Sequence, residues 1–355
     1  MQPNLTGFRV LFVSAASSDI GFGHLSRCLS LASYAQLCGA DIEFLVFGDL
    51  DAKERIIAAD FSCILIETAA TSSAKWPQTI GLKADVVIVD LLYPGFLDSV
   101  TPSIFFRSVR NLGRLLVLID VLGENSIKSQ LSMLSLDIVV CPYVTSDLGM
   151  QITSGRYLQG ANYALLAPEY ANLPVRYLRK NADRVLVSCG GSDPLGYTSE
   201  ILCGLDNVSK FLEVRVVVGP MFSTVLKSEV TKLAAKSRHQ VAIVSSPTRL
   251  LNEMLWCDLA ICSNGLTKYE LAASQTPALL FSIDAHHESV NRPFASKQTA
   301  IDLGVGISSS RLVQVTTELL SNLVWRSSMA RKGRELIDGM GTERLFNEIN
   351  KSIFA

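Results

Sequence analysis

One histidine of this sequence follows a turn that could present it to a ligand. In the stretch SSDIGFGHLSRCLSLA, His24 comes directly after Gly21 and Gly23 and before an apolar helical pattern. An imidazole changes charge near neutral pH and can take a proton from water. The two glycines allow positive φ and close approach of a ligand to the backbone. The pattern predicts either a catalytic histidine or one that only caps or packs on the first helical turn, and it leaves both open.

A second loop has the residue types of an anion nest. VSCGGSDP, residues 187–194, places Gly190, Gly191 and Ser192 after a predicted strand. Ser192 or Asp193 can act as an N-cap, and Pro194 suits the first helical position. The stretch therefore predicts a helix start, and the same geometry can point backbone N–H groups at a phosphate.

A third stretch, DLAICSNGLTKYELAA, joins a predicted strand to a helix through a short polar turn. Backbone N–H groups and the positive end of the helix suit a diphosphate at such a turn. Glu270 falls in the first helical turn, where a carboxylate suits the vicinal hydroxyls of a ribose. It could equally be a surface glutamate favoured by the helix dipole. The turn consists of Ser263, Asn264, Gly265, Leu266 and Thr267.

Other polar residues follow predicted strands without a diagnostic pattern. His286 and His287 are adjacent in DAHHESVN, and adjacent histidines can bind a metal ion. No third ligand stands at a metal-site spacing, so the stretch is interpreted as a polar loop facing a cleft. The sequence thus predicts no metal site and no cofactor. Asp90, Tyr93 and Asp120 lie near strand ends, where both substrate-facing groups and turn formers occur.

These residues need elements that carry them to one edge of a sheet. Continuous apolar runs alternate with helical patterns from VLFVSA to DIVVC and again from RVLVSCGG to PALLFSI, which is typical of strands buried on both faces of parallel sheets. The sequence predicts an α/β fold of two Rossmann-like doubly wound domains that face each other across a cleft. The boundary falls near residues 165–180, which gives domains over 1–170 and 171–355. The C-terminal helices after Ser310 can pack back onto the first domain.

Composition bears on the class of partner. The chain has 355 residues with 32 Lys and Arg against 33 Asp and Glu, a net charge of −1, so nothing favours nucleic acid or an anionic membrane. No apolar run reaches the length of a membrane-spanning helix, and the apolar start reads as a strand, not a signal peptide. We therefore expect a cytoplasmic protein with a small-molecule partner. The eight cysteines lack metal-site spacing and read as reduced core residues.

Four stretches of the sequence together carry a family resemblance. GFGHLSRCLSLA, YALLAPEY, VSCGGSDP and CSNGLTKYELAA resemble the PseG/SpsG family, which comprises UDP-2,4-diacetamido-2,4,6-trideoxy-β-L-altropyranose hydrolases of pseudaminic acid biosynthesis and their spore-coat polysaccharide relatives. The family is similar in fold to the two-domain glycosyltransferases of GT-B type, including the lipid II N-acetylglucosaminyltransferase. The resemblance covers most of residues 8–310.

The resemblance implies roles for residues of this chain. His24 matches the catalytic histidine and Glu270 the glutamate that holds the ribose, while Gly190, Gly191 and Ser192 match the glycine-rich loop. Tyr93, which lies one position from the family's tyrosine, is the second catalytic residue that the resemblance implies. Asn264 stands where many relatives have glycine, and HHESVN replaces the usual Asn-Gln pair, so the sugar is less defined than the nucleotide.

The implied reaction is loss of UDP from C1 of a diacetamido-trideoxyhexose, with His24 as general base for water and no metal or cofactor. The pathway is nonulosonic acid or surface polysaccharide biosynthesis, and the partner is a UDP-sugar. Two alternatives stay open: a GT-B glycosyltransferase that moves the sugar to an acceptor, and a sugar-nucleotide-binding protein without turnover.

Overall fold

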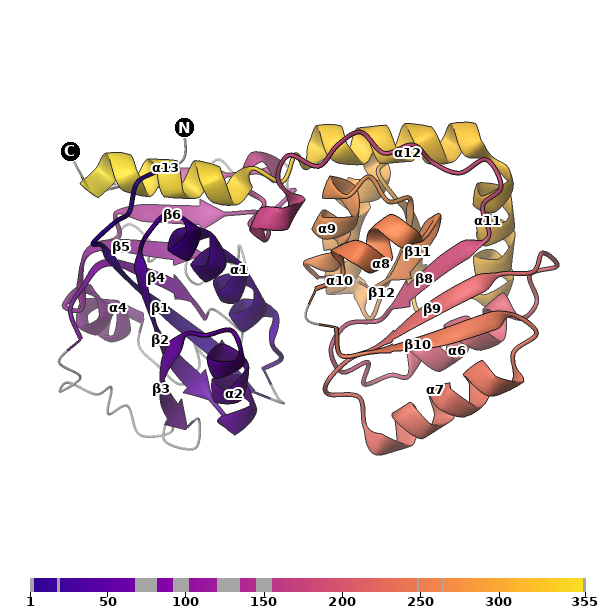
Figure 1. The fold of residues 1–355 in the computed structure, drawn as a ribbon, viewed down its shortest axis with the longest axis horizontal. Helices are drawn as coiled ribbons and strands as arrows, with labels where there is room; N and C mark the ends of the chain where they lie inside the picture. Colours follow the sequence, from indigo (N-terminus) through magenta and orange to yellow (C-terminus); the bar gives the residue numbers. More distant parts are fainter. Residues whose placement is uncertain are drawn as a thin grey trace. The chain divides into compact units, whose positions relative to one another are not determined.

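The chain folds into two compact units. The computed structural model describes residues 3–17, 20–67, 82–91, 102–119, 135–144, 155–247, 249–263 and 265–353. One unit comprises Met1–Pro168 together with Gly339–Ala355, and the other comprises Glu169–Asp338. Each unit contains one parallel sheet with helices, so the fold is α/β with two Rossmann-like doubly wound domains (Figure 1).

The first unit is built on a sheet with the strand order β3-β2-β1-β4-β5-β6-β7. Alternate residues of strand β1 pack on opposite faces of the sheet. Val10 and Phe12 belong to one apolar cluster, and Leu11 and Val13 belong to the other. The sheet is therefore buried on both sides, as its continuous apolar runs predicted. Its elements are β1 (Arg9–Ala16), α1 (Gly23–Leu37), β2 (Asp41–Gly48), α2 (Leu50–Ala58), β3 (Ser62–Glu67), β4 (Ala84–Asp90), α4 (Pro102–Arg110), β5 (Gly113–Ile119), β6 (Ile138–Cys141), β7 (Arg156–Gln159), the 3-10 turn η2 (Ala161–Tyr163) and the C-terminal helix α13 (Gly341–Ile353).

The second unit repeats the design with the strand order β10-β9-β8-β11-β12-β13. It begins within the 3-10 turn η3 (Pro168–Tyr170). Its elements are β8 (Arg184–Ser188), α6 (Tyr197–Leu205), β9 (Glu213–Val218), α7 (Thr224–Lys236), β10 (Gln240–Ser245), α8 (Leu251–Trp256), β11 (Leu259–Cys262), α9 (Thr267–Ala273), β12 (Ala278–Ser282), α10 (Ala285–Ser296), β13 (Ile301–Val305), α11 (Ser309–Ser321) and α12 (Leu323–Leu336).

The strand order reverses beside the first strand of each sheet. In the first unit β1 lies between β2 and β4, and in the second β8 lies between β9 and β11. All of these pairs are parallel. Loops that leave neighbouring strands at such a reversal part from each other, so ligands bind there, outside the carboxyl ends of the strands.

Three strands were not predicted from the apolar runs of the sequence, and all three are edge strands. β3 and β7 flank the first sheet, and β13 ends the second. None has a continuous buried run: every residue of β3 and β13 is at least partly exposed, and β7 buries only Leu158. An edge strand is covered less than a central one, and its sequence is correspondingly less apolar.

Two helix starts differ from the sequence-based expectation. The helix after the glycine-rich loop begins at Tyr197 and not near Pro194, because the Asp193 carboxylate reaches across a turn to accept the N–H groups of Tyr197 and Thr198 at 3.0 and 2.8 Å. The segment with His286 and His287 is the start of α10 and not a loop, because Asp284 caps it by accepting the His287 N–H at 2.8 Å.

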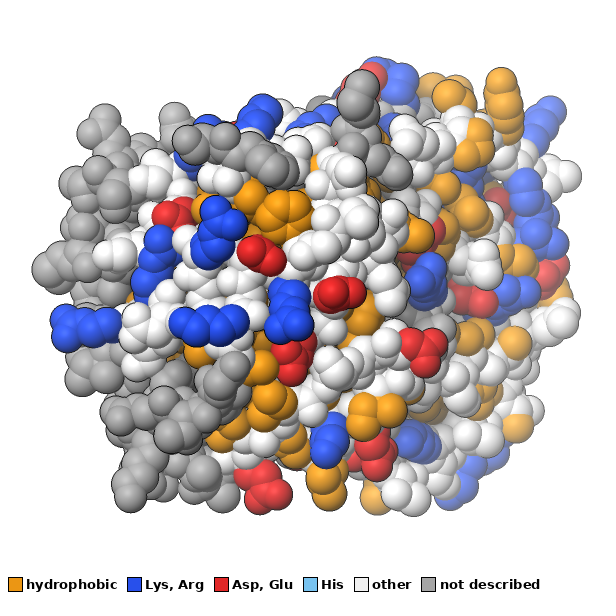
Figure 2. All heavy atoms as spheres, turned by 60° about the vertical axis from the view of Figure 1, so that its left-hand side comes forward, with side chains coloured by type: hydrophobic (Ala, Val, Ile, Leu, Met, Phe, Trp, Pro, Cys, Tyr) orange, Lys and Arg blue, Asp and Glu red, His pale blue; other side chains and the backbone are white. Residues whose placement is uncertain are grey.

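Charged side chains of both signs lie on one face of the molecule (Figure 2). On the side drawn in Figure 2, Lys and Arg side chains are interspersed with Asp and Glu. None of the helices in the described part of the chain combines the length and apolar character needed to cross a bilayer. Six of the eight cysteines are buried, in agreement with their apolar sequence context.

The glycine-rich loop is fixed by a close backbone approach. A Cβ on Gly219, which follows β9, would lie 2.3 Å from the Gly191 carbonyl oxygen and 2.6 Å from that of Gly190. The Met221 N–H also donates to the Gly191 carbonyl at 3.0 Å. The loop after β8 can therefore follow this path only because Gly219, in the loop after the neighbouring strand β9, has no side chain.

We predict that Gly219→Ala destabilises the second unit by about 1 to 3 kcal/mol, because the added methyl group overpacks against backbone that must move. Gly191→Ala is the control, since a Cβ there meets no atom within 4 Å. Urea denaturation of both variants measures the difference. Equal midpoints for the two variants would contradict this role of Gly219.

Candidate active site

The first unit brings His24 to Asp90 across the strand reversal. β1 and β4 are neighbours with Ser14 paired to Asp90, the last residue of β4. His24 is the second residue of α1, which follows β1. Of the two glycines before it, only Gly21 has a positive φ, +83°, whereas Gly23 is already helical. The sharp turn at Gly21 thus starts α1 with the imidazole beside the end of β4.

The His24 ring is held by a hydrogen bond to a fully buried carboxylate. Nδ1 of His24 lies 2.7 Å from Oδ1 of Asp90, whose side chain has no exposed surface, while the His24 side chain is 12% exposed. The N-cap of α1 is Phe22, and no side chain caps it. His24 therefore does not cap the helix. Asp90 is not a substrate-facing group as its strand-end position suggested, because its carboxylate points into the protein.

Arg27 binds the same carboxylate from the next turn of α1. Its Nε and Nη2 donate to Oδ2 and Oδ1 of Asp90 at 2.6 and 2.8 Å, and its Nη1 lies 3.4 Å from the Tyr143 hydroxyl. Burial alone would raise the pKa of Asp90, but the charges of Arg27 and His24 and their hydrogen bonds hold it below its ordinary value. Asp90 is consequently an anion at neutral pH.

An ionised Asp90 decides which nitrogen of His24 carries the proton. A carboxylate can only accept, so the neutral imidazole donates from Nδ1 and keeps its lone pair on Nε2. No partner of Nε2 is found among the residues that the structure describes. The arrangement is that of a general base oriented by a buried carboxylate, in which the carboxylate also stabilises the imidazolium that forms.

The second unit brings the two predicted phosphate loops together across its own reversal. β8 and β11 are neighbours with Ser188 paired to Cys262, so the loops that follow both strands start side by side. The Ser263 N–H donates to the Ser188 carbonyl at 3.3 Å. A Cβ on Gly190, whose φ is +86°, would lie 3.8 Å from the Ser263 hydroxyl. Glycine there leaves the backbone open to a close ligand.

Glu270 lies in the first turn of α9, which begins at Thr267 with Leu266 as its N-cap. Burial raises the pKa of Glu270 to about 7, the hydrogen bond with Tyr170 lowers it, and the nearby Glu169 raises it. Glu169 is in turn 3.2 Å from Arg249. The structure places the buried, neutral Tyr170, at the start of the second unit, near this carboxylate.

Some predicted residues fall outside the described ones. These are Tyr93, Asn264 and Asp120. Of the turn, Ser263, Gly265, Leu266 and Thr267 are described, as are Gly190, Gly191 and Ser192 of the glycine-rich loop.

Of the adjacent histidines, the His287 side chain is held by its own helix. Nδ1 of His287 is 2.7 Å from Oδ1 of Asp284, the capping residue of its own helix. Across the described ranges, no group of three His, Cys, Asp or Glu side chains is placed to hold a metal ion.

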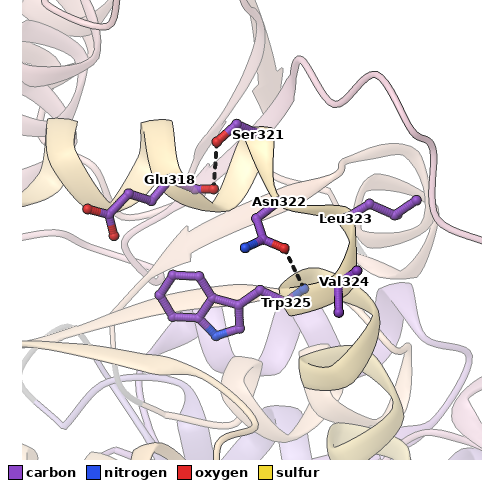
Figure 3. Close-up of a pocket in the computed structure, with 6 residues that line it drawn as sticks. All are labelled: Glu318, Ser321, Asn322, Leu323, Val324 and Trp325. Atoms are coloured by element: carbon purple, nitrogen blue, oxygen red, sulfur yellow. Dashed lines mark hydrogen bonds between the residues drawn. The ribbon is translucent and has the colours of Figure 1, made fainter.

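A pocket of about 570 Å³ lies elsewhere, where α11 meets α12 (Figure 3). The Asn322 side chain caps α12 by accepting the Trp325 N–H at 2.9 Å, and the Ser321 hydroxyl donates to the Glu318 carbonyl. None of its lining residues belongs to a loop at the carboxyl end of a strand, so the pocket is not the candidate site.

Sequence reasoning missed Arg27 and Tyr170. Arg27 lies one helical turn after His24, a spacing that puts both on one face of α1, and it stands among apolar residues. That context signals a buried arginine with an acidic partner. Tyr170 had no local signal, because it meets Glu270 from 100 positions away in the chain.

Sequence comparison finds similarity to two curated proteins. No protein-family model matches the sequence. The chain is 26% identical over 193 residues to the spore coat polysaccharide biosynthesis protein SpsG of Bacillus subtilis (strain 168), a match that covers 54% of this chain. The chain spans about half the length of the curated relatives it matches, 57% of SpsG and 53% of an uncharacterized protein of Methanocaldococcus jannaschii.

Solved structures match nearly the whole chain. MurG of Acinetobacter baumannii superimposes with a TM-score of 0.67 at 15% identity, over 97% of this chain and 99% of MurG. The spinosyn forosaminyltransferase SpnP superimposes with the same TM-score at 12% identity, over 99% of this chain and all of SpnP. At these identities the likeness establishes the fold, which is of the GT-B type.

We predict that Arg27→Gln lowers the free energy of unfolding by about 3 to 5 kcal/mol, because it leaves the buried Asp90 carboxylate without its cation. Arg114→Gln is the matched control: Arg114 is 71% exposed and 3.8 Å from Asp85, and its loss should cost no more than about 1 kcal/mol. Urea denaturation measures both. Equal losses of unfolding free energy in the two variants would contradict the stabilising role of the buried Arg27–Asp90 pair.

The pH dependence has a defined sign. Because the folded-state pKa of Asp90 is lowered, its contribution to stability is complete above the ordinary value of 3.8 and is lost as the pH falls through the lowered one. In Arg27→Gln, the part of the acid-induced loss of stability that comes from Asp90 should be absent.

Proposed function

We propose that this chain, which is PseG/SpsG-like in sequence and has the GT-B fold, is an enzyme that releases UDP from a UDP-sugar with water as acceptor. The observation that carries the proposal is the hydrogen bond from His24 to the buried Asp90, which leaves Nε2 of His24 as a base. The likeness to SpsG supports a place in polysaccharide biosynthesis. The substrate that the family resemblance favours is a UDP-diacetamido-trideoxyhexose, an intermediate class of nonulosonic or pseudaminic acid formation.

In the proposed reaction Nε2 of His24 takes a proton from water as the water oxygen bonds to C1 of the sugar. The bond between C1 and the diphosphate oxygen breaks, and its electron pair leaves with UDP. Asp90 keeps the imidazole in the required tautomer and stabilises the imidazolium charge. Arg27 neutralises Asp90 in the resting state and fixes its orientation through two hydrogen bonds.

The second unit would hold the nucleotide. Glu270 would accept hydrogen bonds from the ribose hydroxyls. The backbone N–H groups of the Gly190–Ser192 loop and of the turn from Ser263 through Thr267 would face the diphosphate and stabilise the charge that develops on it. The adjacency of Gly190 and Ser263 supports this assignment, because two loops that converge on one strand reversal can share one diphosphate.

A glycosyltransferase is the second candidate, and the fold favours it: SpnP, which superimposes over the whole chain, is a forosaminyltransferase by name. Transfer and hydrolysis share the base and the leaving group and differ in the oxygen that attacks C1. UDP release measured with and without an acceptor distinguishes them. Release at full rate in buffer alone supports the hydrolase, and release that requires an acceptor alcohol supports the transferase.

We predict that His24→Asn cuts the single-turnover rate of UDP release about 10²- to 10⁴-fold, because general-base catalysis contributes that much. UDP affinity and the thermal midpoint should change little. Ser30→Ala, on the same helix and bonded only to the Ser26 carbonyl, controls for damage to α1 and should leave the rate unchanged. A rate that falls only in proportion to stability would contradict the catalytic role.

We predict that uridine affinity rises about 10-fold between pH 6 and pH 8, because the pKa of Glu270 is about 7 and the ionised carboxylate is the better acceptor for ribose hydroxyls. Uridine is the ligand of choice since it carries no phosphate that titrates in this range. Glu270→Gln should bind more weakly with no such pH dependence. Calorimetric titrations at three pH values measure both, and an equally steep dependence in the variant would exclude Glu270 as its source.

A further inference from the structure

Lys268 is a buried cation whose hydrogen-bond partners are all neutral. It is the second residue of α9 and is 4% exposed. Its ammonium group donates to the Val290 carbonyl at 3.1 Å and to Oδ1 of Asn291 at 3.0 Å. The rings of Phe294 and Tyr269 lie 5.5 and 5.8 Å from it. Among the described residues no carboxylate forms an ion pair with it.

The partners of Lys268 place its charge at the carboxyl edge of the sheet. Asn291, which is fully buried, uses its amide N–H groups on the Phe281 carbonyl at 3.2 Å and on the Ser282 hydroxyl at 2.9 Å. Ser282 is the last residue of β12. The ammonium group therefore lies between α9 and α10, beside the end of β12. Lys268 itself comes directly after Thr267, the last residue of the turn that would face the diphosphate.

The titratable neighbours do not neutralise this charge. Burial raises the pKa of the Cys262 thiol, at the end of β11, to about 12, so the thiol is neutral at physiological pH. Asp302 in β13 favours the charged lysine from a distance, while its Oδ1 accepts the Gly304 N–H at 2.9 Å. Burial is the largest influence and lowers the pKa of Lys268 to about 8. A buried charge without a counter-ion is costly, and such groups concentrate at functional sites.

We propose that Lys268 recognises the diphosphate of the nucleotide, whose negative charge supplies the counter-ion that the protein itself does not provide. This proposal rests on the proposed function of the second unit and adds to it a residue that distinguishes nucleoside diphosphates from nucleosides. Because Lys268 is anchored through Asn291, its charge is already in place before the ligand binds, so little side-chain entropy is lost on binding. The competing explanation is a lysine that only ties α9 to α10.

Calorimetric titration of Lys268→Met with UDP and with uridine tests the proposal. We expect UDP affinity to fall about 10- to 100-fold, the loss of a charged hydrogen bond, while uridine affinity stays the same. Lys210→Met is the matched control, because Lys210 also donates to a backbone carbonyl, that of Ala182 at 2.8 Å, but near the amino end of β8. It should bind both ligands normally. An equal loss for UDP and uridine, or no loss, would overturn the proposal.

A measurement on the unmodified protein decides the question if Lys268→Met does not fold. At pH 8 a lysine with a pKa near 8 is half protonated, and a bound diphosphate should raise its pKa and draw in a proton. Titrations in two buffers of different ionisation enthalpy should show proton uptake with UDP and none with uridine. No difference between the ligands overturns the role of Lys268 alone, whereas failure to bind either ligand overturns the nucleotide site itself.

Discussion

A single topological constraint, the reversal of strand order beside the first strand of each sheet, determines where chemistry can occur in this protein. Because β1 lies between β2 and β4, the first turn of α1, which carries His24, meets the end of β4 and its Asp90. Because β8 lies between β9 and β11, the glycine-rich loop meets Ser263. The parallel strands bury both faces in apolar side chains, so polar groups gather at the carboxyl edge, where the loops part.

Buried charged groups are compensated differently at the two strand reversals. At the first, Arg27 and His24 bond both oxygens of the Asp90 carboxylate, so the imidazole is oriented before any ligand arrives. At the second, Lys268 has only neutral hydrogen-bond partners, and Glu270 has the neutral Tyr170 beside it. An internally compensated site suits catalysis, whereas charges left for a ligand to complete suit binding. The division of labour that we propose between the units rests on this difference.

Fold and reaction are set by different residues. Proteins at 15% identity or below share the whole two-domain architecture with this chain, because buried strands need only apolar side chains of suitable size. The proposed reaction depends on few atoms: the oxygen that reaches Nε2 of His24 and the groups that would hold the leaving diphosphate. Hydrolysis and transfer differ in the first of these alone, so the fold by itself does not decide between them.

The sequence by itself determined the α/β class, the central strands, the glycine turn before His24 and the helix that starts just before Glu270, because each depends on neighbours within a few positions. It missed the edge strands β3, β7 and β13, whose partial exposure weakens their apolar pattern. Only the tertiary structure joined His24 and Arg27 to Asp90, 66 and 63 positions away, and Tyr170 to Glu270. It also showed that Lys268 is buried. Strand order brings these groups together, and strand order is decided by how whole helices and strands pack, which no short stretch encodes.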